Sequence, residues 1–464
     1  MMRVGVARLG RVVAVSLAAL FASSAVRAAG ETRFALENGL RVILRPVDGA
    51  DEAVVLVCYD FGENADPEGK SGLAHFIEHL YFTAGAGKTP VRTFDEIVSA
   101  YQGLFNAQTG EDYTVFATVV PAGELENELT DAASRMDGLK ITSADVDRER
   151  PRIVLELRNM YGNVSGLSAL NRAREAVRPS LPGSQKGGMI EVIEALTLEE
   201  LKDAAEKWYK PVNARLVITG ALDAERTKKR VEELFGGIQA GEKPQTHERS
   251  FVERPERVVV QGNEPGAPGI VVLAYPCPPA GQEHAAAASL LVARLMAKAQ
   301  AAGEFTGQFP PPVFHPVLDD PYLLYVGARM KPNETPEEAV KRLDDRVAAA
   351  FDGAVQAGER TNVRNGAGMF LGFVDPPAGL PGQGLYGLAF SLARRAQVGI
   401  DAGEVSKRLD EIDEAGMAAA RDACFNAAKR AAVVILPMPT PPEEVGPGVE
   451  EGGAGGAGGA SGGE

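Results

Sequence analysis

The stretch Gly72-Leu73-Ala74-His75-Phe76-Ile77-Glu78-His79-Leu80 contains two histidines four residues apart and a glutamate between them. In a helix, residues three and four apart share a face, so His75, Glu78 and His79 would project in the same direction. Two imidazoles can hold a zinc ion, and a nearby carboxylate can take a proton from the metal-bound water. The same residues could also occur on a helix face that is buried in a core or exposed to solvent and holds no metal. The motif therefore states a hypothesis that the rest of the chain has to support.

A second pair of acidic residues follows on a helix expected to begin at Ser143 as N-cap. Glu149 and Glu156 are seven residues apart and would share one face, although Pro151 between them makes that geometry approximate. Two glutamates on a charged helix are usually a solvated face. Glu156, however, has apolar neighbours from 153 to 157, which predict partly buried surroundings and a partner for its carboxylate. A carboxylate is a common third zinc ligand.

These motifs together resemble the insulinase/pitrilysin class of zinc metallopeptidases, in the two-module form of mitochondrial processing peptidase subunits. The similarity is dense from about residue 33 to 162. It rests on H-x-x-E-H followed by a glutamate after 76 intervening residues, on the hairpin Asn38-Gly39, on the block Gly72 to His79, and on Asn106-Ala107-Gln108-Thr109 followed by Asp112-Tyr113-Thr114-Val115.

The resemblance implies a role for each matching residue. It implies one Zn²⁺ per chain held by His75, His79 and Glu156, with Glu78 as general base. Glu149 matches an acidic residue that supports catalysis in the family. Asn106 and Ala107 match an edge strand to which an extended peptide adds, although Asn106 could also be an ordinary polar residue beside a turn.

The second half of the chain repeats the order of the first. Arg257-Val-Val-Val echoes Arg41-Val-Ile-Leu, and Ile270 to Tyr275 echoes Val54 to Tyr59. An offset of 217, one residue more than the 216 between these strands, places Val292, Leu295 and Met296 at the motif positions, so the copy is expected to lack metal. In the family this half usually offers an arginine and a Gly-Leu-x-Tyr segment to the substrate. Here Arg294 is followed by unrelated sequence, and that contact is not assigned.

Local patterns predict the main elements. Asn38-Gly39 predicts a hairpin between strands at 34–36 and 40–44, and the apolar run 53–59 predicts a buried strand. Two strands are expected within 105–120 around Gly110-Glu111-Asp112. Helices are expected at 93–100, 125–136, 196–208, 223–235, 337–351 and 405–432. The predicted fold is α+β, with two homologous modules, each an antiparallel-rich β-sheet with helices packed on one face.

The length of 464 residues suits two modules, expected at 29–240 and 254–438 with a polar linker between them. Residues 1–28 read as a signal peptide, with arginines, an apolar run at 12–26 and the site Val26-Arg27-Ala28. An uncleaved anchor is the alternative. No other stretch is long enough to span a membrane. Residues 439–464 are rich in Gly, Glu and Pro and predict a disordered tail.

Composition narrows the functional classes. The formal charge of −15 argues against a nucleic-acid partner. Cys58, Cys277 and Cys424 have no metal-ligand spacing, and buried thiols are expected, with one bridged pair as the alternative. From the motifs and the family resemblance we expect an exported zinc endopeptidase, periplasmic or extracellular, that acts on peptide or protein substrates as a homodimer or heterodimer. The alternative is a non-catalytic or partner-dependent binding subunit of a heterodimeric peptidase complex.

Overall fold

The computed structural model describes residues 30–87, 105–162, 166–180, 185–247, 250–265, 267–277, 282–302, 313–314, 323–363, 383–400 and 402–438. The expected leader, the expected helix at 93–100 and the expected tail lie outside these residues. Among the described helices, none has the length and apolar character needed to cross a membrane.

The first sheet has six strands in the order β1-β2-β8-β3-β6-β5. Its strands are β1 (Thr32–Ala35), β2 (Arg41–Pro46), β3 (Glu52–Tyr59), β5 (Phe105–Thr109), β6 (Thr114–Pro121) and β8 (Ala214–Gly220). The β1–β2 hairpin is confirmed by its antiparallel register, in which Phe34 pairs with Val42. The buried strand expected at 53–59 is confirmed as β3 at the centre of the sheet, and the two strands expected within 105–120 are confirmed as β5 and β6.

The second sheet repeats this topology. Its strands are β9 (Arg257–Pro265), β10 (Ile270–Pro276), β11 (Val313–Phe314), β12 (Leu323–Arg329) and β13 (Ala431–Met438), in the order β11-β12-β10-β13-β9. β13 runs parallel to β9 as β8 runs parallel to β2, and all other pairs are antiparallel. The sequence repeat is therefore a repeat of structure, and the α+β fold with two antiparallel-rich modules is confirmed.

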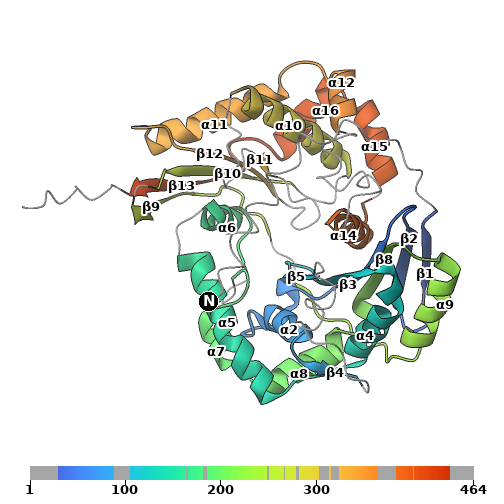
Figure 1. The fold of residues 1–464 in the computed structure, drawn as a ribbon. Coiled ribbons are helices and arrows are strands. Elements are labelled where there is room, and N and C mark those ends of the chain that lie inside the picture. The colour runs from blue at the N-terminus through green and yellow to red at the C-terminus, as the bar shows by residue number, and fades with distance from the viewer. Residues whose placement is uncertain are drawn as a thin grey trace, which may run out of the picture.

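Helices from each module cover one face of that module's sheet and bury an apolar core against it (Figure 1). In the first module they are α2 (Leu73–Tyr81), α4 (Leu125–Asp137), α5 (Ser143–Gly162), α7 (Ile190–Ala195), α8 (Leu198–Trp208) and α9 (Ala224–Phe235). In the second they are α10 (Gln282–Ala301), α11 (Pro336–Phe351), α12 (Ala357–Asn362), α15 (Ala402–Glu411) and α16 (Glu414–Ala423). Short elements complete the described chain: β4 (Gly85–Ala86), β7 (Leu139–Lys140), η1 (Glu63–Ala65), η2 (Ala122–Glu124) and η3 (Pro211–Asn213).

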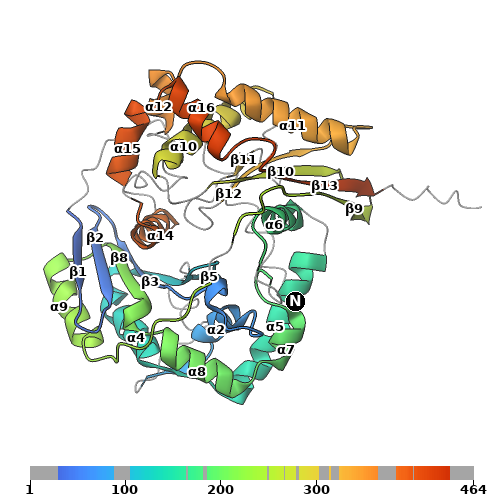
Figure 2. The same cartoon turned by 180° about the vertical axis from the view of Figure 1, so that it is seen from behind.

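The other face of each sheet is covered by a helix from the opposite half of the chain. α6 (Gly166–Val177) packs Ala169, Leu170 and Ala173 against the second sheet. α14 (Gln383–Val398) packs Leu388, Ala389 and Leu392, among others, against the first. Both helices lie between the two sheets when the molecule is viewed from either side (Figures 1 and 2). The two modules are thus joined by a reciprocal exchange of helices, while their expected residue limits stay predictions.

Two local predictions are wrong. Ser143 is inside α5 and not its N-cap, because Thr142 accepts the Asp145 N–H at 3.3 Å and donates its own N–H to Asp145 at 2.9 Å. The continuous helix expected at 405–432 is broken after Glu411, where Asp413 caps α16, and the chain becomes β13 at Ala431. Both errors concern the residue that caps a helix, because Ser, Thr and Asp can act as N-cap at several positions of the sequence. The three cysteines are buried free thiols, as expected.

Candidate metal centre

The helix that carries the motif begins at a tightly held turn. Asp66 accepts hydrogen bonds from the backbone N–H groups of Gly72 (2.6 Å) and Ala74 (2.9 Å), so its side chain caps α2. Gly72 has a φ of +95°, and a Cβ there would lie 2.8 Å from the Cα of Gly188. A glycine is therefore required where the loop at 185–190 crosses the start of the helix.

The structure brings together His75, His79 and Glu156 from α2 and α5. His75 Nε2 is 3.7 Å from one Glu156 oxygen, and His79 Nε2 is 3.5 Å from the other. One ligand atom from each of the three residues lies within 4.8 Å of the other two. Zinc bonds of about 2.0–2.2 Å place two ligand atoms of a tetrahedral ion roughly 3.3–3.5 Å apart. The donor set fits a zinc ion with small side-chain adjustments.

The remaining nitrogen of each histidine is held by a second group. His75 Nδ1 is 2.7 Å from the carbonyl oxygen of Gly187, which favours the tautomer whose Nε2 is free to bind metal. His79 Nδ1 is 3.5 Å from Glu149 Oε2. Glu149 therefore faces a histidine rather than the metal position, although the sequence places it on the same helix as Glu156.

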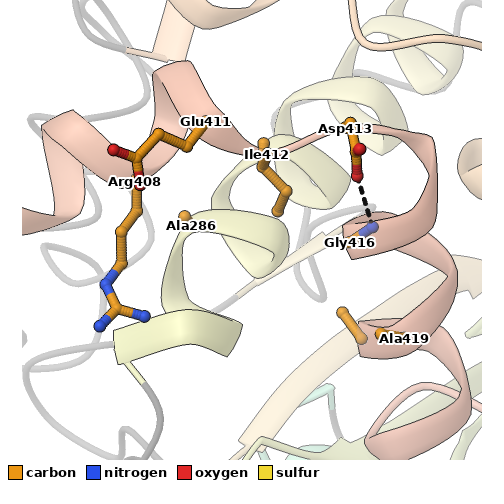
Figure 3. Close-up of a pocket in the computed structure, with 8 residues that line it drawn as sticks. Ala286, Arg408, Glu411, Ile412, Asp413, Gly416 and Ala419 are labelled. Atoms are coloured by element: carbon orange, nitrogen blue, oxygen red, sulfur yellow. Dashed lines mark hydrogen bonds between the residues drawn. The ribbon is translucent and has the colours of Figure 1, made fainter.

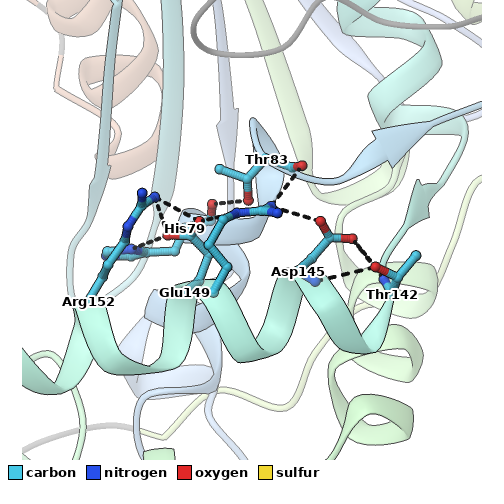
Figure 4. A network of polar contacts seen from close by, with 7 residues as sticks. His79, Thr83, Thr142, Asp145, Glu149 and Arg152 are labelled. Carbon is cyan, nitrogen blue, oxygen red and sulfur yellow. Dashed lines mark hydrogen bonds and ion pairs between the residues drawn. The ribbon is translucent and has the colours of Figure 1, made fainter.

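Glu149 is itself fixed by cations along α5 (Figure 4). Its carboxylate accepts hydrogen bonds from Arg148 (3.1 Å) and Arg152 (3.0 Å) and is only 2% exposed. Burial raises its pKa, but His79 and the two arginines outweigh burial and hold the pKa of Glu149 below its usual range.

The site has a surplus of negative charge. Burial lowers the pKa of His79, but Glu149, Glu156 and Glu78 raise it to about 9. Contact with His79 in turn holds the pKa of Glu156 below its usual range, against the effect of burial. Three carboxylates around one imidazole provide an environment that a divalent cation would compensate.

The surroundings of Glu156 differ from the expectation. Its side chain is 49% exposed, and the neighbouring Leu155 is 59% exposed. Only Ile153, Val154 and Leu157 point into the core. Because α5 is amphipathic, an apolar run along the chain does not make a continuous apolar environment. Glu156 therefore lies at the edge of the core, while His75 and His79 are largely buried beside it.

Glu78 and the expected edge strand are in contact. Thr109, at the end of β5, donates its hydroxyl to Glu78 Oε2 at 2.6 Å. β5 is the last strand of the first sheet, so its outer edge carries no further strand among the described residues. Ala107 packs toward the core, whereas the exposed Asn106 donates its side-chain amide to the hydroxyl of Tyr386 on α14 at 2.7 Å.

The second module carries no counterpart of this centre among its described residues. Val292 and Leu295 on α10 are buried in its core, and Met296 packs beside them. The side chain of Arg294 is bound within the second module. It pairs with Glu359 at 2.9 Å and donates to the carbonyl oxygen of Ala350 at 3.0 Å. A pocket between α10 and the α15–α16 turn is lined by Ala286, Arg408, Glu411, Ile412, Asp413, Gly416, Ala419 and Ala420 (Figure 3). It contains none of the metal-centre residues.

Several partners of the site were not anticipated from the sequence. Thr109 carried a signal, because it ends the Asn-Ala-x-Thr segment already noted. Gly187 and Tyr386 carried none, since each makes its contact across more than 100 residues of sequence. Asp66 acts locally, as the cap of α2.

Comparison with known families agrees with this architecture. Residues 41–178 match the model described as insulinase (peptidase family M16), and residues 195–305 match the peptidase M16 inactive domain. Together the two matches span more than half of the chain.

Individual relatives are similar over half of the chain or less. Zinc protease PqqE of Helicobacter pylori is 28% identical over 206 residues, which are 43% of this chain and 46% of that protein. The mitochondrial-processing peptidase subunit beta of Saccharomyces cerevisiae is 27% identical over 217 residues, 45% of each chain. The matches thus span less than half of the length of these relatives.

Solved structures share the fold over most of the chain. A protease from Helicobacter pylori superposes with a TM-score of 0.71 at 18% identity, over 89% of this chain and 100% of that one. The periplasmic protease PqqL from Escherichia coli gives a TM-score of 0.66 at 18% identity, over 89% of this chain and 48% of that one.

The paired α+β modules and the inverted His-x-x-Glu-His helix define a class of zinc protease-like proteins built from two related halves. The chain belongs to the insulinase family, peptidase family M16.

Proposed function

We propose that this chain is an exported zinc-dependent endopeptidase that hydrolyses peptide bonds of extended or unfolded peptides. The observation that carries the proposal is the convergence of His75, His79 and Glu156 on one point beside Glu78 and the edge strand β5. The names of the relatives as zinc proteases support the same chemistry.

His75, His79 and Glu156 would hold one zinc ion per chain. When bound, zinc lowers the pKa of a water ligand toward neutrality and polarises a carbonyl group. Glu149 would hold the His79 ring in the orientation that presents Nε2, as carboxylates next to metal-bound histidines do.

Glu78 would act as the general base. It lies on the same helix face as both histidines, and the Thr109 hydroxyl fixes one of its oxygens at 2.6 Å. The other oxygen is the one expected to accept a proton from the attacking water and to pass it to the leaving amine.

The substrate would add to β5 as a further strand. Main-chain hydrogen bonds to the outer edge of Phe105–Thr109 would hold an extended peptide without selecting its sequence. Asn106 and Ala107 lie in the middle of this strand. The side chain of Asn106 is engaged by Tyr386, so it would contribute chiefly through its backbone.

Export and assembly complete the proposal. The N-terminal 28 residues support secretion into the periplasm or outside the cell, and the PqqL neighbour is a periplasmic protease. Peptide or protein substrates are expected, with assembly as a homodimer or as a heterodimer with a related subunit.

One observation favours a second function, that of a partner-dependent binding subunit. Arg294 is consumed by Glu359 and by backbone carbonyl groups, so it offers nothing to a substrate. In the family, an arginine of the second half usually contacts the peptide. A partner chain would then supply that contact, and the processing-peptidase relatives are named as subunits.

Cleavage of a mixed library of unstructured peptides by the purified mature chain tests the proposal, with bound zinc quantified in the same sample. We expect cleavage that is lost in Glu78→Gln while zinc is retained. Bound zinc without cleavage would favour the partner-dependent subunit. Absence of zinc would refute the site itself.

A further inference from the structure

The carbonyl group that holds His75 belongs to a residue that is itself held from the other side. Gly187 has a φ of +81°, and a Cβ there would lie 3.0 Å from the Leu157 side chain. Its carbonyl oxygen is 2.7 Å from His75 Nδ1. Its N–H donates to Glu63 Oε1 at 2.9 Å. The Glu63 carboxylate therefore helps to hold the Gly187 backbone, together with the Tyr161 hydroxyl, which donates to the adjacent Lys186 carbonyl oxygen at 2.6 Å.

Glu63 is a buried charge with a defined environment. It belongs to η1, in the loop before the motif helix, and is only 6% exposed. The Nη2 atom of Arg174 lies 3.6 Å from the second oxygen of Glu63, Oε2. Arg174 and Arg178 also donate to the buried Glu111 at the β5–β6 turn. A buried carboxylate needs such compensation, because its desolvation is costly.

Arg174 lies on α6, which is the helix packed on the second sheet, and Arg178 directly follows the end of this helix. Contacts therefore run without a gap from the second module through Arg174 and Glu63 to the Gly187 backbone and His75. Of these groups, Arg174, Glu63 and Gly187 belong neither to the H-x-x-E-H motif nor to the expected ligand set.

We propose that Glu63 is a positioning residue for the metal centre, which orients His75 by fixing the Gly187 backbone, with Arg174 of α6 holding Glu63 in place. This inference rests on the proposed zinc function. It adds that the metal affinity of the first module depends on a hydrogen-bond acceptor at position 63. The counter-ion of this acceptor is Arg174 of α6, the helix that packs on the second sheet.

Two conservative substitutions separate positioning from simple charge balance. Glu63→Gln removes the charge but keeps an oxygen at the same reach for the Gly187 N–H. Arg174 would still have Glu111 and Glu175 as partners. Glu63→Asp keeps the charge but withdraws the carboxylate by one methylene, which breaks the 2.9 Å contact. Positioning predicts that Gln is tolerated and Asp is not, whereas charge balance predicts the reverse.

The test uses the full mature chain with Zn²⁺ and Co²⁺ as probes. Zinc affinity is measured by competition with a chromophoric chelator, and the visible spectrum of the Co²⁺-loaded protein reports ligand geometry. We expect Glu63→Asp to weaken zinc binding by about 10–100-fold and to shift the Co²⁺ bands, as loss of a group that orients a ligand does. Glu63→Gln should stay within about threefold of the wild type.

Glu68→Gln is the matched control, because Glu68 lies exposed in the same loop. It should leave both readouts unchanged. An unchanged spectrum and affinity in a folded Glu63→Asp protein would overturn the inference, and so would loss of affinity in Gln but not in Asp. If the wild-type chain binds neither metal, the proposed function fails, which is a distinct result.

Discussion

At the residue scale, each histidine of the metal centre depends on a group outside its own helix. Glu149 is 2% exposed and faces His79 Nδ1 at 3.5 Å. We predict that Glu149→Gln weakens zinc binding by about 10–100-fold, because the charge that orients and polarises the imidazole is lost. Isothermal titration with Zn²⁺ would measure this. Asp147→Asn, an exposed change on the same helix, should have no effect, and equal affinities for the two variants would contradict the role of Glu149.

Asp66 predicts a pH dependence of stability. Burial raises its pKa from 3.8 to about 8, although the N–H groups of Gly72 and Ala74 favour its charged form. The folded protein holds this proton more tightly than the unfolded chain. The contribution of Asp66 to the free energy of unfolding is therefore full below about pH 4 and is lost as pH rises toward about 8.

Asparagine cannot titrate, so Asp66→Asn should flatten the dependence of the free energy of unfolding on pH in this range. The change removed should be on the order of 5 kcal/mol at most. Urea unfolding of both proteins between about pH 4 and pH 8 would measure the difference. Asp48→Asn, in an exposed turn, should keep the wild-type slope. If the Asp66 variant also keeps that slope, the carboxyl is ionised in the folded protein.

What the sequence could predict at this scale follows from helix geometry. His75, Glu78 and His79 share a face by their spacing alone, and Glu156 could be placed through the family pattern. Gly187 could not be predicted, because its carbonyl group reaches His75 only through the tertiary path of a loop 112 residues away. Tyr386 is similarly 280 residues from Asn106.

At the scale of elements, helices and strands that pack within their own half of the chain could be predicted from their apolar pattern. Helices that pack on the sheet of the other half could not. The apolar face of α4 packs into one core, and the continuous apolar run of β3 indicates a strand that is buried on both faces. α14 was missed, because its apolar side chains pair with the outer face of a sheet formed more than 150 residues earlier in the chain. Nothing in residues 383–398 indicates that partner.

The packing of α14 predicts a stability loss from a single truncation. Leu392 is 2% exposed and belongs to the core formed with the first sheet. Leu392→Ala should lower the free energy of unfolding by about 2–5 kcal/mol, from lost burial and the cavity left behind. Chemical denaturation would measure it. Leu155→Ala, at a leucine that is 59% exposed, should change stability by less than about 0.5 kcal/mol. Equal effects at the two sites would contradict the packing of α14.

At the scale of the whole molecule, the exchange of α6 and α14 makes each half incomplete alone. A fragment of residues 30–247 would lack α14 and expose the apolar face that includes Val54, Leu56 and Val217. We predict that this fragment aggregates, whereas the chain through residue 438 is soluble, because exposed apolar patches of this kind promote association. Size-exclusion chromatography would distinguish them. A monomeric fragment with cooperative unfolding would show that the modules fold independently.

The internal repeat accounts for this arrangement. Two copies of one topology place corresponding helices, α6 and α14, across each other's sheets. Among the described residues, a set of metal-ligating side chains that meet at one point is found in the first copy alone. The second copy instead supplies a covering helix, α14, to the sheet of the first.

The central claim is that one zinc ion binds where α2 and α5 meet. The most direct test is an anomalous difference map at the zinc absorption edge, from crystals of the mature chain grown with stoichiometric Zn²⁺. We predict one dominant peak, about 2.0–2.2 Å from the Nε2 atoms of His75 and His79 and from a Glu156 oxygen. A peak elsewhere with this site vacant, or no peak in protein that binds zinc neither in crystals nor in solution, would contradict the account.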